Sequence, residues 1–328
     1  MAFKNKKLKI LIGEPDQYSP KAITTLRKLG TVFDRQLSKK YFFRLLPEID
    51  ILVVRLGIRV DKRILDVAKN LKAVAVNTTG LNHIDLTEAE KRGIAVISLR
   101  GQTSFLEKIH ATPELTFGLI LALIRKIPWA FESVKKGQWD RNKFAGRELN
   151  RKILGLLGLG RVGKIVARYG KAFGMTLIAC DPQVSAQTMK RYNVRKVNQT
   201  DLFKQADILS LHVLYSPKVD KMIKERHLRL LKPSALFINT ARGELVDERA
   251  LLKALRNKWI AGAALDVLGD ESPDGEHLKN NPLLKYARRH ENLLIVPHLG
   301  GAALEAWQMT EEYLASLVYK HFKDGSKR

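Results

Sequence analysis

The fold prediction starts from residues 153–163, which read ILGLLGLGRVG. The apolar run at 153–157 predicts a buried strand, and apolar residues at helical spacing after the glycines predict a helix. In such a turn Gly158 permits a tight bend, Gly160 lets a pyrophosphate approach the backbone, and Gly163 lets the helix pack closely on the strand. Because the strand and the helix supply the context that this glycine pattern requires, it predicts a dinucleotide-binding turn.

A carboxylate follows the next predicted strand. Residues 176–180 form an apolar run, and Asp181 comes directly after it. A carboxylate at this position accepts the ribose hydroxyls of NAD and repels the additional phosphate of NADP, so the sequence predicts NAD as the cofactor. The alternative is an ordinary glycine turn beside an aspartate at a strand end. Cys180 is predicted to be a small core residue of the strand.

Strand-like and helix-like segments alternate along almost the whole chain. The first set of predicted strands lies at 8–12, 50–54, 72–76 and 94–97, and the second at 153–157, 176–180, 207–211, 235–239, 260–265 and 293–296. Short apolar runs separated by helix-length segments predict parallel sheets covered on both faces. The predicted fold class is therefore α/β, with two doubly wound parallel-sheet domains.

Two long helical segments are predicted to connect these domains. An apolar segment at 113–127 starts with Pro113, a residue favoured in a first helical turn, and is expected to pass from one domain to the other. A segment with helical periodicity at 302–322 follows Gly300 and Gly301 and is expected to return the chain to the first domain.

The composition limits the class of protein. The chain has 328 residues, of which 45% are hydrophobic and 28% charged, a balance typical of a soluble globular protein. No apolar run is long enough to cross a bilayer, so no membrane interaction is expected. The single cysteine fits a reducing compartment, and we expect a cytoplasmic protein.

The charge balance is strongly basic. Lysine and arginine number 58 against 33 aspartate and glutamate residues, which gives a net charge of +25. Such a charge attracts small acids, cofactor phosphates, nucleic acid or anionic lipid. The basic residues occur singly or in short clusters throughout the chain, which favours scattered surface charges, so no specific nucleic-acid binding is expected.

Three residues that can do chemistry follow predicted strands of the second set. They are Arg242, Glu271 and His298. Ligands of open α/β sheets bind beyond the carboxyl ends of the strands, so the three loops are expected to converge near the nucleotide. Taken singly, each residue has a structural alternative as a surface charge, a solubilising loop residue or a strand cap. Together they supply a fixed cation, a carboxylate and an imidazole, which predicts a catalytic site.

From about Val53 to Glu312 the chain resembles the D-isomer-specific 2-hydroxyacid dehydrogenases, most closely their phosphoglycerate-dehydrogenase-like branch. The motifs that carry the resemblance are residues 155–163, 239–243 with 246–248, 261–267 and 297–301. The resemblance implies a Rossmann NAD domain at 109–299 inserted into a flavodoxin-like substrate domain at 1–108 and 300–328.

The resemblance also implies a role for each candidate catalytic residue. His298 would be the general acid/base on the C2 hydroxyl, and Glu271 would hold its imidazole and favour the charged form. Arg242 would bind the substrate carboxylate and polarise the C2 oxygen. The implied reaction is hydride transfer between NAD and C2 of a small anionic 2-hydroxy or 2-oxo acid.

Binding residues are implied in the same way. Asp266 matches a position that hydrogen-bonds the nicotinamide carboxamide, and Thr79 and Gly80 match a loop whose amides hold the substrate carboxylate. Arg55 matches a substrate-side arginine of the phosphoglycerate branch, with a solvated strand-end charge as the alternative. The other candidate cofactor residues are Gly158, Gly160, Arg161, Val162, Gly163, Asp181, His212, Val213, Thr240, Ala241 and Gly300.

The chain departs from the family pattern at several positions. Val76 and Thr78 stand where phosphoglycerate enzymes usually carry an arginine and a glycine, which weakens the case for a phosphorylated substrate, and Leu214 replaces a typical proline. Residues 103–109 resemble an insertion, either a cover for the cleft or a variant connection. No regulatory domain is recognised at the C-terminal end, so a short form is expected.

A homodimer is expected, because family members usually dimerise through the NAD domain, and the cleft between the domains is expected to close over substrate. Two other functions stay open. An L-type lactate or malate dehydrogenase would carry its glycine pattern near the N-terminus rather than at Gly158. An NAD(H)-sensing protein like the family's transcriptional corepressors fits the basic charge, but no long disordered tail accompanies it and the catalytic residues are present.

Overall fold

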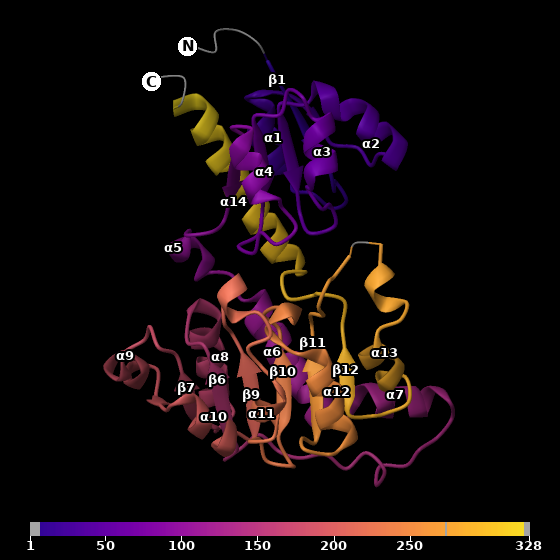
Figure 1. Cartoon of the computed structure of the whole chain (residues 1–328), viewed down its shortest axis with the longest axis vertical. Coiled ribbons are helices and arrows are strands. Elements are labelled where there is room, and N and C mark those ends of the chain that lie inside the picture. Colours follow the sequence, from indigo (N-terminus) through magenta and orange to yellow (C-terminus); the bar gives the residue numbers. More distant parts are fainter. Residues whose placement is uncertain (1–6, 273, 325–328) are drawn as a thin grey trace. The chain divides into compact units, whose positions relative to one another are not determined.

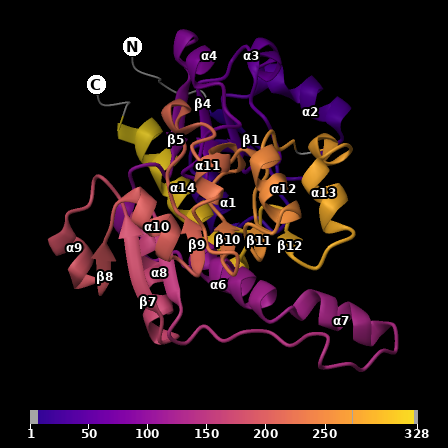
Figure 2. The ribbon, with the colours of Figure 1, turned by 60° about the horizontal axis from the view of Figure 1, so that its bottom comes forward.

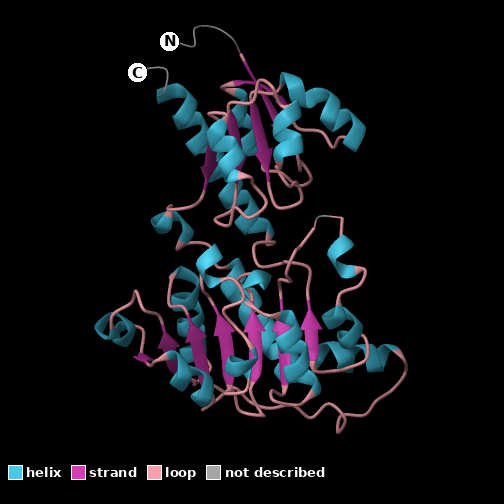
Figure 3. Cartoon of the chain, in the orientation of Figure 1, coloured by secondary structure: helices cyan, strands magenta, loops and turns pink. Residues whose placement is uncertain are grey.

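The computed structural model describes residues 7–272 and 274–324, which form two compact units. Unit 1 comprises Met1–Lys108 and Ala303–Arg328, and unit 2 comprises Ile109–Ala302. The chain passes from unit 1 into unit 2 and returns through its last helix (Figure 1). Each unit is built on one sheet of parallel strands with helices packed against it (Figure 3).

Unit 1 contains a five-stranded sheet in the order β2-β1-β3-β4-β5, the flavodoxin-like order. Its strands are β1 Leu8–Ile12, β2 Gly30–Phe33, β3 Ile51–Val54, β4 Ala73–Val76 and β5 Ala95–Ser98. Its helices are α1 Pro20–Arg27, α2 Lys39–Leu45, α3 Lys62–Val67, α4 Leu86–Lys91, α5 Thr103–Leu106 and α14 Leu304–Asp324. The central strands β3 and β4 are entirely apolar because helices bury both of their faces.

Unit 2 contains a seven-stranded sheet in the order β12-β11-β10-β9-β6-β7-β8. Its strands are β6 Ile153–Leu157, β7 Thr176–Cys180, β8 Val194–Lys196, β9 Ile208–Leu211, β10 Leu236–Asn239, β11 Gly262–Leu265 and β12 Leu293–Ile295. Its helices are α6 Ala111–Ile124, α7 Ile127–Lys135, α8 Arg161–Ala172, α9 Ala186–Arg191, α10 Gln199–Gln205, α11 Glu225–Leu228, α12 Glu248–Arg256 and α13 Pro282–Ala287. The strand order reverses between β6 and β9, and doubly wound sheets bind dinucleotides at such a reversal. The predicted fold class is confirmed.

The structure adds two strands to those expected from the sequence, both at sheet edges. β2 has four residues, β8 has three, and most of their side chains are only partly buried or exposed. A strand this short at an edge carries too few apolar positions to stand out in the sequence.

The helix expected at 113–127 is two helices. α6 begins at Ala111 and ends at Ile124, and Lys126 takes a left-handed φ of 55° before α7 begins. α6 is apolar around most of its circumference because it packs against β10, β11, β12 and α8. α7 follows the end of α6 and lies at the edge of unit 2 (Figure 2).

The connection at 103–109 contains a short helix and is tied to unit 1. The Phe105 ring stacks on Tyr313 of α14 with centroids 3.9 Å apart, and the Tyr313 hydroxyl donates to Gln102 at 2.8 Å.

Among the described residues, no helix is both long enough and apolar enough to span a membrane.

Candidate active site

The glycine turn joins β6 to α8. Gly158 has a φ of +93°, and a Cβ there would lie 2.7 Å from the carbonyl oxygen of His212. A Cβ at Gly163 would lie 2.5 Å from the carbonyl oxygen of Gly158, whereas one at Gly160 would meet no described atom within 4 Å. The first and third glycines are therefore required by close backbone packing. The second leaves the start of α8 open, which fits a pyrophosphate held by backbone N–H groups.

Asp181 follows β7 and reaches back to this turn. Its Oδ2 accepts a hydrogen bond from the backbone N–H of Leu159 at 2.8 Å, and its Oδ1 accepts from that of Gln183 at 2.9 Å. A carboxylate oxygen has two lone pairs, so both oxygens can accept a further bond. The carboxylate is thus fixed beside the turn in a position that fits a ribose with free hydroxyls.

Four further candidate cofactor residues flank the turn. Arg161 and Val162 begin α8, and His212 and Val213 follow β9, which neighbours β6. Burial lowers the pKa of His212 to about 3, and its Nε2 lies 3.0 Å from the Ser210 hydroxyl. The imidazole is therefore neutral at physiological pH and brings no charge to this side of the turn.

His298 and Glu271 form a hydrogen-bonded pair in unit 2. His298 Nδ1 lies 2.6 Å from Glu271 Oε2, and Glu271 Oε1 accepts from the backbone N–H of Leu268 at 2.8 Å. Burial raises the pKa of Glu271, but the His298 bond, the Leu268 N–H and the charge of Arg242 outweigh burial and lower it overall. The carboxylate is therefore ionised at neutral pH and occupies Nδ1, which leaves the imidazole Nε2 for proton transfer.

The backbone of His298 is held in an uncommon conformation. Its φ is 53°, in the left-handed region that residues other than glycine rarely adopt. Its N–H donates to the carbonyl oxygen of Asp266 at 2.8 Å, and the Asp266 carboxylate accepts from the N–H groups of Leu299 at 2.5 Å and Gly300 at 2.8 Å. Burial raises the pKa of Asp266 while these bonds oppose the rise. Asp266 therefore braces the loop that orients the imidazole.

Arg242 follows β10 and is half-buried. Its Nη1 donates to the carbonyl oxygen of Ala241 at 2.7 Å, and within the described chain it forms no ion pair with a carboxylate. Burial lowers the pKa of Arg242, while Glu244, Glu271 and Asp266 oppose the shift through their charges, and a guanidinium stays protonated in proteins. This cation is available to bind an anion.

The candidate substrate loop lies in unit 1. Thr79 and Gly80 follow β4, and the hydroxyl of Thr78 donates to the carbonyl oxygen of Gly80 at 2.8 Å, which closes the turn. Arg55 follows β3, the strand next to β4, so these residues share one edge of the five-stranded sheet.

Arg55 is not the solvated charge that the sequence left open. Its Nε and Nη2 donate to Glu311 Oε1 at 2.9 and 2.5 Å, and its Nη1 donates to the carbonyl oxygen of Asp16 at 3.0 Å. The Arg55 side chain is 13% exposed and that of Glu311 is 0% exposed. The two residues form a buried ion pair.

Known proteins share both units. Residues 10–105 match the catalytic domain of the D-isomer specific 2-hydroxyacid dehydrogenases, and residues 117–300 match the NAD-binding domain of the same family. The chain belongs to this family. The recognition made from the sequence motifs is confirmed, and the seven-stranded unit carries the family's NAD-binding domain.

Relatives of this dehydrogenase-family chain carry different names. A D-3-phosphoglycerate dehydrogenase of Methanocaldococcus jannaschii is 36% identical over 95% of this chain, and the chain spans 57% of that relative's length. A glyoxylate reductase of Thermococcus litoralis is 37% identical over 84% of this chain and 80% of the relative. The crystal structure of a D-lactate dehydrogenase from Aquifex aeolicus, complexed with NAD and lactic acid, is 28% identical with a TM-score of 0.80, covering 97% of this chain and 96% of that one.

The structure adds two residues that hold the Arg242 and Glu271 loops of the family domain together. A Cβ at Gly243 would lie 1.9 Å from the carbonyl carbon of Leu268, so only glycine allows these two loops to approach. Glu248 Oε1 accepts from the N–H of Gly269 at 2.6 Å. Both residues belong to motifs visible in the sequence, but their partners follow a different strand, and no local pattern identifies them.

The sequence also gave no indication of hydrogen bonds from α6, the first helix of unit 2. On α6, the Thr112 hydroxyl donates to the carbonyl oxygen of Gly300 at 2.8 Å, and the Thr116 hydroxyl lies 2.9 Å from that of Thr240. The available signal was two threonines four positions apart on a largely apolar helix. Residues at that spacing share one face, and buried hydroxyls need partners.

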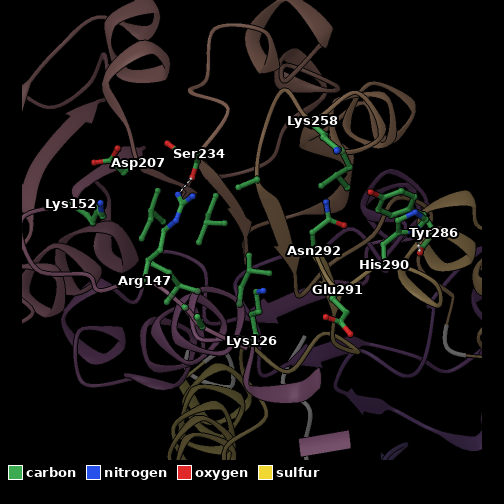
Figure 4. A pocket seen from close by; sticks show the side chains of 18 of the residues that line it. Lys126, Arg147, Lys152, Asp207, Ser234, Lys258, Tyr286, His290, Glu291 and Asn292 are labelled. Carbon is green, nitrogen blue, oxygen red and sulfur yellow. Dashed lines mark hydrogen bonds between the residues drawn. The ribbon is translucent and has the colours of Figure 1, made fainter. Parts of the chain in front are cut away.

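Unit 2 also has a cavity of about 680 Å³ at the amino-terminal ends of its strands. The candidate catalytic residues lie at the other edge of this sheet, after the carboxyl ends of the strands. Side chains around it include Lys126, Arg147, Lys152 and Lys258 (Figure 4). Its lining has six basic side chains with Arg256 and Arg289, against the acidic Asp207 and Glu291. Part of the excess positive charge is therefore concentrated here rather than scattered.

Proposed function

We propose that this chain catalyses NAD-dependent hydride transfer at C2 of a small anionic 2-hydroxy or 2-oxo acid. The observation that carries the proposal is the 2.6 Å bond between His298 and Glu271 in the same unit as the half-buried Arg242. An imidazole bonded to a carboxylate supplies a proton donor and acceptor, and a guanidinium that forms no ion pair with a described carboxylate supplies a fixed charge for a substrate carboxylate.

The three side chains have separate tasks. His298 donates a proton to the C2 oxygen during reduction and removes it during oxidation, exchanging it at Nε2. Glu271 orients the ring through Nδ1 and stabilises the imidazolium. Arg242 binds the substrate carboxylate and stabilises charge on the C2 oxygen. The bound cofactor would supply the redox chemistry, as NAD⁺ for accepting the hydride and as NADH for donating it.

The cofactor is held by the glycine turn, by Asp181 and by the strand-end loops. We assign the pyrophosphate to Gly158, Gly160, Arg161, Val162 and Gly163, the ribose to Asp181, and the remaining contacts to His212, Val213, Thr240, Ala241, Asp266 and Gly300. Thr79 and Gly80 of unit 1 bind the substrate carboxylate through backbone N–H groups. Unit 1, residues 1–108 and 303–328, thereby acts as the substrate domain, and unit 2, residues 109–302, acts as the cofactor domain, so the return to the substrate domain comes three residues later than the 300 expected from the sequence.

The same proposal includes a homodimer in the cytoplasm. Large apolar side chains lie exposed on α7 and just after it, at Ile127, Phe131, Val134 and Trp139, and Trp139 is 87% exposed. An apolar group of this kind on one segment is typical of a protein–protein contact. Light scattering after size exclusion is expected to give the mass of a dimer, and a monomer would contradict this part.

The activity is tested by following NADH oxidation with a panel of 2-oxo acids: glyoxylate, hydroxypyruvate, 3-phosphohydroxypyruvate and larger sugar-derived acids. His298→Ala is expected to lower kcat about 10²–10⁴-fold, because the general acid is lost. His290→Ala is the matched control, since His290 is an exposed residue beside the cavity at the other edge of the sheet. Unchanged kcat in His298→Ala contradicts the mechanism.

A second candidate is an NAD(H)-sensing binding protein, which the net charge of +25 favours because it suits an anionic partner. Tight NADH binding without turnover of any acid in the panel would support it.

A further inference from the structure

The guanidinium of Arg55 forms hydrogen bonds in its plane and also lies against two aromatic rings. Its three nitrogens donate to Glu311 and to the Asp16 carbonyl oxygen. Its carbon lies 4.6 Å from the ring centroid of Trp307 and 5.5 Å from that of Tyr18. An arginine held in this way has few directions left from which an anionic ligand can approach.

Glu311 cannot easily release Arg55. It is fully buried, and its second oxygen accepts from the backbone N–H of Ser19 at 2.8 Å. If the guanidinium turned to another anion, Glu311 would be left as a buried, uncompensated charge, which costs several kcal/mol. The pair therefore stays formed and contributes no net charge to this edge of the sheet.

The two loops that flank the Arg55 loop supply no lysine or arginine. β1 and β4 flank β3, and the loops after them, residues 13–19 and 77–83, contain no lysine or arginine. The loop after β1 instead contributes Glu14, whose carboxylate accepts from the N–H groups of Arg55 at 2.7 Å and Gly57 at 2.8 Å. The loop after β3 has one further arginine, Arg59, and its side chain is exposed.

We infer that Glu311 is a specificity-determining residue: by neutralising Arg55 it makes this edge of unit 1 select a 2-oxo acid without a phosphate group. The inference rests on the proposed function, in which this edge carries the substrate loop. A phosphate group brings nearly two negative charges and needs charge-assisted donors, whereas a hydroxyl or a hydrogen at the same carbon does not.

The wild-type protein provides the first test, because hydroxypyruvate and 3-phosphohydroxypyruvate differ only by the phosphate. The kcat/KM for hydroxypyruvate is expected to exceed that for the phosphorylated acid by about tenfold or more. A phosphate group without a compensating cation loses the attraction between two charges about 4 Å apart, which corresponds to at least about a tenfold change in kcat/KM. A preference for the phosphorylated acid overturns this inference alone. Turnover of no acid in the panel overturns the proposed function and this inference with it.

Glu311→Gln provides the second test. It keeps the shape of the side chain and leaves the charge of Arg55 uncompensated, so the ratio of the two kcat/KM values is expected to move about tenfold toward the phosphorylated acid. The matched control is Glu312→Gln, which removes the neighbouring carboxylate that pairs with Lys21 at 2.9 Å on the surface. Equal ratios in the two folded variants contradict the role of Glu311. If Glu311→Gln does not fold, the wild-type ratio decides.

Discussion

Arg242 and Arg55 occupy equivalent places in two different sheets. Each follows an interior parallel strand at its carboxyl end, and each side chain is half-buried. Arg55 forms a buried ion pair with Glu311, whereas Arg242 bonds to a backbone carbonyl and forms no ion pair with a described carboxylate. In unit 2, Glu271, one of three carboxylates whose charges act on Arg242, is bonded to His298 instead.

The comparison of the two arginines shows that an arginine can bind a ligand anion only when the neighbouring carboxylate is bonded to another group. A guanidinium that already has a buried counter-ion contributes to folding, and it gains little from binding a second anion. A guanidinium that forms no ion pair with a described carboxylate keeps its charge for a ligand. The same residue type at the same strand end is therefore structural in unit 1 and available for chemistry in unit 2.

The largest effect is expected from breaking the pair in unit 1. Arg55→Met leaves Glu311 buried without a partner, so the free energy of unfolding is expected to fall by about 3–5 kcal/mol. Urea unfolding of unit 1, followed by hydrogen exchange of its peptides, measures the change. Arg59→Met is the control, since an exposed arginine of the same loop is expected to shift stability by about 0.5 kcal/mol or less.

The double variant Arg55→Met, Glu311→Leu sharpens this prediction. Replacing both charges by apolar side chains removes the unpaired carboxylate, so part of the lost stability is expected to return, while the Ser19 N–H still loses its acceptor. If Arg55→Met lowers the free energy of unfolding by no more than Arg59→Met does, the ion pair does not stabilise unit 1. Arg55 and Arg242 would then not differ in the way described.

A smaller effect, on activity rather than on stability, is expected in unit 2. Arg242→Met removes a charged donor from the candidate site, and kcat/KM is expected to fall about 10²–10³-fold, equivalent to about 2.7–4 kcal/mol. The free energy of unfolding is expected to change by less than about 1 kcal/mol, because no carboxylate loses its partner. Arg249→Met, an exposed arginine on α12, is the matched control for both measurements. A loss of stability comparable to that of Arg55→Met would show that the two arginines are alike.

Much of this contrast lies beyond what the sequence predicts. The two parallel sheets were predictable because apolar runs such as β3, β4 and β6 keep both faces buried and stand out from the helices between them. Arg242, Glu271 and His298 were predictable as a group, because topology brings strand-end loops to one edge and the family motifs mark each residue.

The partner of Arg55 was not predictable in this way. Glu311 is 256 positions away, on a helix that returns after the whole of unit 2, and nothing local in either segment indicates the pair. The brace that Asp266 forms with Leu299 and Gly300 is likewise a contact between two loops that follow different strands. Motifs identified the residues, but only the structure supplied the partners that separate an available side chain from an occupied one.

The smallest effect is expected from the pH dependence that the Glu271–His298 bond gives to folding. The pKa of Glu271 lies below its ordinary value of 4.5 in the folded protein, so the folded state holds this proton less tightly than the unfolded chain does. The resulting stabilisation is present above the unfolded pKa and is lost as the pH falls through the lowered one. Glu271→Gln cannot titrate, so the difference in urea midpoint between wild type and variant is expected to be constant above about pH 6 and to shrink below about pH 4.5. Glu276→Gln, an exposed glutamate of the following segment, controls for general acid effects. A difference that grows as the pH falls would mean that Glu271 is more basic when folded, and the carboxylate would then not be the ionised partner that leaves Arg242 free.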